Sequence, residues 1–152
     1  MKIIKLIPFL SCIFLLNVAS TCSKDDSSSS SNNQTQVTTT VTSGTWKITL
    51  YNDSGTVKTS NFTGYNFTFG ANNSLTASNS TNNYTGTWSV TDSNSNDDSL
   101  SDLDFNIIFA SPANFQDLSD DWDIISRTDT KIQLIDVSGG NGGTDYLTFE
   151  KN

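Results

Sequence analysis

The chain has 152 residues, with 16 acidic and 8 basic side chains, two cysteines and no histidine. This length predicts one domain, and the lack of histidine excludes Ser-His and Cys-His nucleophilic pairs and zinc sites that use histidine. The excess of negative charge predicts that the protein binds neither DNA nor RNA.

The first 21 residues have the composition of a signal peptide. Lys2 and Lys5 precede an apolar run from Leu6 to Val18, which is too short for a typical membrane span. Removal of residues 1–21 leaves 6 basic against 16 acidic residues, a formal charge of −10. It also leaves Cys22 as the only cysteine, so the mature chain cannot form an internal disulfide.

The residues around Cys22 resemble the lipobox of bacterial lipoproteins, in which a cysteine after a short small-residue stretch is lipidated and becomes the first residue. Ala19-Ser20-Thr21 fills the small-residue positions, and Ser23-Lys24-Asp25-Asp26 is similar to the export signal of bacteroidete-type lipoproteins. The resemblance implies acyl chains such as palmitate on Cys22 and a lipid-anchored location on the outer face of the outer membrane. The alternative is an ordinary signal peptide followed by a chance cysteine.

Residues 22–43 are almost wholly polar and rich in serine and threonine. Within residues 23–43, Val37 and Val41 are the only apolar residues, and they provide too little apolar surface for this segment to fold. The sequence therefore predicts a disordered tether between the lipid anchor and the body. A flexible chain of this length has a root-mean-square reach of roughly 25 Å and stretches to about 70 Å.

Residues 44–152 are predicted to form a small all-β domain. Trp46, Ile48 and Leu50 alternate with polar residues, which is the period-2 pattern of a strand with one buried face. Further strands are expected within residues 65–69, 75–77, 84–90, 103–109, 122–127, 131–137 and 144–151, joined as an antiparallel meander. Ser111-Pro112, with Phe115 and Leu118 beyond it, predicts one short helix near residues 112–119.

Gly44-Thr45-Trp46 resembles the Gly-x-Trp of lipocalins, and the body is similar to lipocalin-like domains of bacteroidete lipoproteins. The resemblance implies a barrel of about eight strands and a basic residue, either Lys151 or Arg127, placed late in the chain against the first tryptophan. A body this short leaves little room inside a barrel. We expect its aromatic residues to fill the core rather than line a cavity for a small apolar ligand; they are Trp46, Trp88, Trp122, Phe67, Phe69, Phe105, Phe109 and Phe149.

Three polar motifs are candidate binding or modification sites. The loop from Asp92 to Asp102 has oxygen ligands at alternate positions, as calcium loops do, but lacks the glycine and terminal glutamate of the EF-hand pattern. We expect a solvated loop there, with weak calcium binding as the alternative. Asp98-Ser99-Leu100 resembles a three-residue O-glycosylation motif of bacteroidete-type bacteria. The glycine-rich run 139–143 is expected to be a hairpin connection rather than a phosphate site.

The remaining candidates for catalysis are carboxylates. Asp97-Asp98, Asp120-Asp121 and Asp123 could supply the pair that glycoside hydrolysis needs, although adjacent aspartates in turns are more often solubilising. The sequence thus predicts no catalytic residue, cofactor or metal. It favours a surface-exposed, membrane-anchored and non-enzymatic lipoprotein. The alternatives are a binder of a small apolar ligand and an interaction module of a cell-surface assembly.

Overall fold

The computed structural model describes residues 29–92, 100–138 and 142–152. None of the helices in these ranges is long and apolar enough to cross a bilayer. The elements in chain order are α1 (Ser29–Val41), β1 (Trp46–Asp53), β2 (Thr56–Val57), the 3-10 helix η1 (Thr59–Phe62), β3 (Asn66–Phe69), β4 (Ser74–Ser78), β5 (Asn83–Asp92), the 3-10 helix η2 (Leu100–Asp102), β6 (Leu103–Phe109), α2 (Ala113–Gln116), β7 (Asp120–Arg127), β8 (Lys131–Val137) and β9 (Thr144–Lys151).

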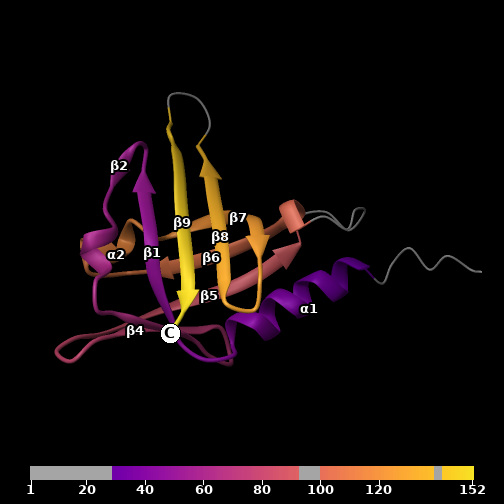
Figure 1. The fold of residues 1–152 in the computed structure, drawn as a ribbon, viewed down its shortest axis with the longest axis horizontal. Coiled ribbons are helices and arrows are strands. Elements are labelled where there is room, and N and C mark those ends of the chain that lie inside the picture. Colours follow the sequence, from indigo (N-terminus) through magenta and orange to yellow (C-terminus); the bar gives the residue numbers. More distant parts are fainter. Residues whose placement is uncertain (1–28, 93–99, 139–141) are drawn as a thin grey trace, which may run out of the picture.

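Eight strands, β1 and β3 to β9, form a closed antiparallel barrel (Figure 1). Each strand from β3 to β8 pairs with the next along the chain, and β1 closes the sheet by pairing with β9 along most of its length. On its other side β1 meets β3 where Trp46 pairs with Phe67. The short strand β2 pairs only with the end of β1 and extends beyond the barrel. The predicted antiparallel meander barrel is therefore confirmed.

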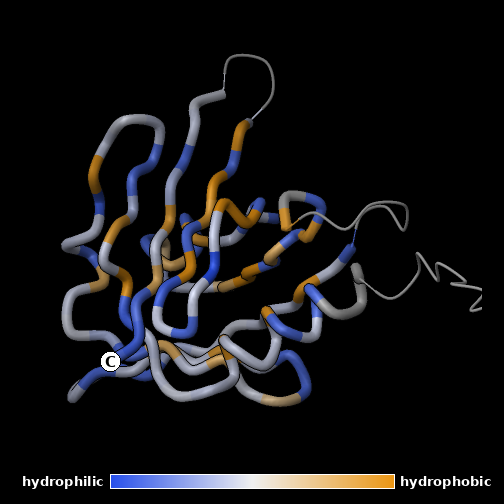
Figure 2. Tube along the Cα trace, turned by 45° about the vertical axis from the view of Figure 1, so that its right-hand side comes forward, coloured by the Kyte–Doolittle hydropathy of each residue, from blue (hydrophilic) through white to orange (hydrophobic). Residues whose placement is uncertain are grey.

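Alternation of inward and outward side chains explains why these segments are strands. In β6, Leu103, Phe105, Ile107 and Phe109 are buried, while the residues between them are partly or fully exposed. Figure 2 shows the resulting change between hydrophobic and hydrophilic positions along the strands. The inward residues of all eight strands meet in one core. The hydrophobic effect on this inner face holds the barrel together, because the described part of the chain contains no cysteine.

The predicted disordered tether is wrong from Ser29 onward. Residues 29–41 form helix α1, in which Val37 and Val41 are fully buried. The two valines are four residues apart and so share one helix face. By itself this segment has too little apolar surface to fold, but the barrel supplies a surface on which the two valines are buried. This contact stabilises the helix despite the low helix propensity of a Ser/Thr-rich segment.

The short helix near residues 112–119 exists, but α2 covers only Ala113–Gln116, with Pro112 as its N-cap residue. Phe115 is fully buried, as the spacing predicted, and so is Leu118 just beyond the helix. Asp120 and Asp121 begin β7, two residues before the strand expected from residue 122. The strand β2 and the two 3-10 helices have no clear sequence pattern because they are only two to four residues long.

Candidate functional site

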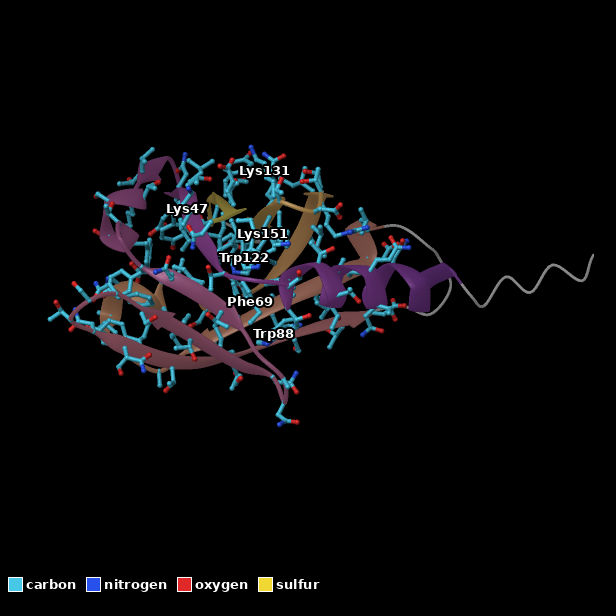
Figure 3. All side chains as sticks on the ribbon, turned by 60° about the horizontal axis from the view of Figure 1, so that its bottom comes forward. Lys47, Phe69, Trp88, Trp122, Lys131 and Lys151 are labelled. Atoms are coloured by element: carbon cyan, nitrogen blue, oxygen red, sulfur yellow. The ribbon has the colours of Figure 1, made fainter. Side chains whose placement is uncertain are left out.

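Helix α1 crosses one end of the barrel, which we call the α1 end (Figure 3). The side-chain amide of Gln34 donates a hydrogen bond to the carbonyl oxygen of Val90 in β5 at 2.7 Å. Near the other end of the helix, the indole nitrogen of Trp46 donates to the carbonyl oxygen of Val41 at 2.8 Å. These bonds and the burial of Val37 make α1 part of the folded unit.

A third contact of α1 comes from Arg127 at the end of β7. Its two terminal guanidinium nitrogens lie 2.8 Å from the hydroxyl oxygen of Thr40 and 2.8 Å from the amide oxygen of Gln36. The guanidinium group donates both bonds, since it has no acceptor. Beside it runs a surface groove of about 390 Å³, which Thr39 and Asp129 also line. Arg127 therefore fixes α1 against β7 and forms one wall of this groove.

The expected contact between a late basic residue and the first tryptophan is made by Lys151. Its ammonium nitrogen lies 5.2 Å from the ring centroid of Trp46, within the range of a cation–π interaction. The same nitrogen donates a hydrogen bond of 2.9 Å to the carbonyl oxygen of Asp129. The structure thus decides between the two residues left open by the sequence: Lys151 covers Trp46, and Arg127 holds α1.

The opposite end of the barrel, which we call the distal end, is closed by η1 and α2. Phe115 of α2 packs against Phe62 of η1 with their ring centroids 5.2 Å apart. The hydroxyl of Tyr51 donates to the carbonyl oxygen of Asp117 at 2.5 Å. Burial, followed by nearby carboxylates, raises the pKa of this hydroxyl well above its usual value.

Lys58 is the only basic residue that the described ranges place at the distal end. It forms ion pairs with Asp53 and, at 3.1 Å, with Asp117. Hydrogen bonds to these two carboxylates raise the pKa of the Lys58 ammonium group. This network ties the end of β1 to the turn after α2.

Between the two ends, the barrel interior is packed with aromatic rings. Phe69 contacts Trp88, Phe105 and Phe149 with centroid distances of 5.4 to 5.5 Å and nearly perpendicular ring planes. Such edge-to-face geometry is the favoured arrangement for aromatic pairs. All eight aromatic residues assigned to the interior by sequence are buried. This confirms that they form the core.

Of the candidate carboxylates, the described ranges contain Asp120, Asp121 and Asp123, all of them in β7 on the wall of the barrel. Asp121 and Asp123 are exposed on β7, and Asp104 of β6 pairs in register with Asp123. Burial, then the charges of Asp121 and Asp123, raise the pKa of Asp104. Asp120 is less exposed and has a pKa raised mainly by burial. Within the described residues, no group of three acidic, cysteine or histidine side chains could hold a metal ion.

Other predicted positions lie outside the described residues. They are Cys22, most of the 92–102 loop with Asp97, Asp98 and Ser99, and part of the glycine run, residues 139–141. The lipidation, calcium, glycosylation and hairpin predictions for these positions therefore stay predictions.

Sequence reasoning missed the contacts of α1. The spacing of Val37 and Val41 was the one available signal, because residues four apart share a helix face. Gln34 and Arg127 gave no signal, since their partners are 56 and 87 or more residues away in the chain.

Comparison with known proteins returned no matching protein family, no matching characterised protein and no matching solved structure. The fold is therefore defined by its own topology and contacts.

Proposed function

We propose that the chain is a lipid-anchored, non-enzymatic protein of the cell surface whose lipocalin-like barrel acts through its outer surface. The observation that carries the proposal is the aromatic packing of the interior, in which rings such as Phe69 and Phe105 lie 5.5 Å apart, centroid to centroid. A small ligand would have to displace these rings. An outer surface carried on a rigid, filled barrel needs no such rearrangement.

The anchor belongs to the proposal through the residues around Cys22. Acyl chains on this cysteine would hold the protein in the outer membrane, because each buried methylene contributes about 0.8 kcal/mol and several chains make attachment stable. Replacement of Cys22 by Ala should release the protein from membranes and remove the acyl mass. Unchanged membrane partition and an unmodified Cys22 in the wild-type protein would contradict the anchor.

The location of the carboxylates supports a non-enzymatic role. Asp121 and Asp123 lie on the exposed side of β7, in contact with solvent, whereas enzymes commonly exclude water from the reacting groups. A pair for glycoside hydrolysis needs two carboxyl groups that flank one bound sugar. We expect the double substitution of Asp121 and Asp123 by Asn to leave the cell-surface role intact.

Native mass spectrometry of the protein extracted from membranes tests the role of the interior. The proposal predicts the mass of the acylated chain with no further small molecule retained. A retained apolar molecule would favour the alternative of a ligand binder. A protein partner that crosslinks through outer-surface residues, and not through a bound ligand, would identify the chain as an interaction module of a surface assembly.

A further inference from the structure

The docking of α1 changes how far the barrel can move from its anchor. Cys22 precedes the first described helical residue, Ser29, by seven positions. Seven residues span at most about 25 Å even when fully extended, compared with about 70 Å for the tether expected from sequence. The anchor point is thus tied to Ser29, the first residue of α1, by this short segment, which we call the leash.

The distal end of the barrel lies farther from the anchor point than the α1 end does, because the strands run from one end to the other. A strand of eight residues, such as β1 or β9, is about 26 Å long. If the leash is attached at the α1 end, the distal end can stand a full barrel length farther from the membrane. A short leash alone does not decide whether the barrel stands upright or lies on its side, so the charges of the two ends become important.

The two ends differ strongly in charge. Four of the five basic residues in the described ranges lie at the α1 end, together with four acidic ones; they are Lys47, Arg127, Lys131 and Lys151, with Asp92, Asp102, Asp129 and Glu150. At the distal end five acidic residues face a single basic one; they are Asp53, Asp117, Asp120, Asp136 and Asp145, with Lys58. Counted over the described residues, the α1 end is therefore balanced in charge, and the distal end is strongly acidic.

The lysines of the α1 end lie on one side of α1 (Figure 3). Lys47 and Lys131 flank Glu150 on neighbouring strands, and Lys131 forms an ion pair with it at 3.3 Å. Lys151 lies close by, over the ring of Trp46. These ammonium groups can reach the phosphate groups of lipid headgroups, and each basic residue near an anionic surface adds to the attraction.

From the short leash and the charge difference we infer that the α1 end faces an anionic lipid surface, with Lys47, Lys131 and Lys151 next to the headgroups. This inference rests on the proposed membrane anchor. The acidic distal end is repelled by the same surface and points away from it. The distal end and the part of the barrel wall next to it are then the surfaces open to a partner.

Lysine footprinting tests this orientation with the residues that the chain already has. Residues 29–152 contain both α1 and the complete barrel, so the chain from Cys22 onward retains the fold. Its Cys22 thiol is coupled to a maleimide headgroup lipid in vesicles of phosphatidylcholine and phosphatidylglycerol. Acetylation rates of individual lysines by a water-soluble reagent are then measured by mass spectrometry, and each is compared with its own rate in the uncoupled chain.

We expect acetylation of Lys47, Lys131 and Lys151 to slow by roughly threefold or more on the anionic vesicles, while Lys58 keeps its rate. The protection should weaken at high salt and on vesicles of phosphatidylcholine alone, because the charge effect is screened or removed. Equal slowing of Lys58, or no slowing of any lysine, would overturn the proposed orientation.

A pair of variants tests the part played by α1. Val37→Asp places a charge at a fully buried helix position and should release α1, which lengthens the leash and removes the protection. Thr35→Asp adds the same charge at an exposed position of α1 and should keep the protection. If Val37→Asp also unfolds the barrel, Arg127→Gln serves as a milder release of α1; protection that persists with α1 released would contradict the role of the helix.

Because Cys22 is coupled to the lipid chemically in this experiment, the orientation is tested independently of whether cells acylate Cys22. An unacylated Cys22 in cells would overturn the anchor without affecting the footprint. A footprint without selective protection would overturn the orientation even if Cys22 carries acyl chains.

Discussion

The two ends of the barrel are closed in different ways. The distal end is closed by η1 and α2, which connect consecutive strands and place the rings of Phe62 and Phe115 in the aromatic core. The α1 end is closed by a helix that precedes the barrel in the chain and contributes only Val37 and Val41 to the core. The helix is further held by hydrogen bonds from Gln34, Trp46 and Arg127. The distal closure therefore belongs to the core, whereas the α1 closure depends on a few separable contacts.

Removing the central ring of the distal closure should have the largest effect. Phe115 is fully buried and contacts five other aromatic rings. Phe115→Ala should lower the free energy of unfolding by about 4 kcal/mol, measured by urea denaturation. Ile108→Ala, at a position that is 59% exposed, is the control and should change stability by no more than about 0.5 kcal/mol. A loss at Phe115 as small as that at Ile108 would contradict a distal closure that belongs to the core.

At the α1 end, Trp46→Phe should cost about 2 kcal/mol, because it leaves the Val41 carbonyl without its indole donor and weakens the contact with Lys151. Lys151→Gln removes the cation and keeps the indole bond, so it should cost less than half as much. The same denaturation curves give both values. If the two variants lose equal stability, the indole hydrogen bond contributes nothing measurable.

At the same end, Arg127→Met removes both hydrogen bonds from the guanidinium group to α1 and replaces it with an apolar side chain. We expect a loss of about 1 kcal/mol that is confined to α1. Amide hydrogen exchange should accelerate in residues 33–41 and remain unchanged in β6 and β7. Faster exchange throughout the barrel would show that α1 and the barrel unfold together.

The wall between the two ends should give the smallest effect. The pKa of Asp104 is raised above its ordinary value of 3.8, first by burial and then by Asp121 and Asp123. The native state therefore holds this proton more tightly than the unfolded state, so the group favours folding at low pH and this contribution is lost as the pH rises through the raised pKa. Asp104→Asn should stabilise the protein at neutral pH by about 0.5 kcal/mol, a value reduced for solvent screening.

The pH dependence provides the check on Asp104. In thermal melts, the stabilisation by Asp104→Asn should disappear on acidification to pH values below 3.8, where the wild-type carboxyl is protonated in both states. Asn106→Asp is the opposite change, since it adds a carboxylate paired in register with Asp121, and it should destabilise at neutral pH. Stabilisation by both variants would rule out charge repulsion as the cause.

Most of the barrel could be predicted from local pattern. Strands such as β6 can be recognised in the sequence because every second residue is apolar. Consecutive segments of this kind, separated by turn residues, favour pairing as antiparallel neighbours. Burial of the aromatic residues followed from the same alternation. The candidate site was harder to predict from the sequence, since its contacts join α1 to β5 and β7, which are far away in the chain.

The sequence by itself determined the all-β class, the meander order and most of the inward residues, because these depend on side-chain period and on short connections. In β1 the period fails: a bulge between Ile48 and Leu50 leaves Leu50, which was predicted to face inward, exposed, and buries Tyr51 instead. Only the tertiary structure decided that residues 29–41 are a helix, that Lys151 rather than Arg127 covers Trp46, and that the two ends of the barrel differ in charge. The physical reason is the same in each case. A polar segment with two valines has no stable structure alone, and it acquires one only when the closed sheet offers Trp46, Val90 and Arg127 at the same end.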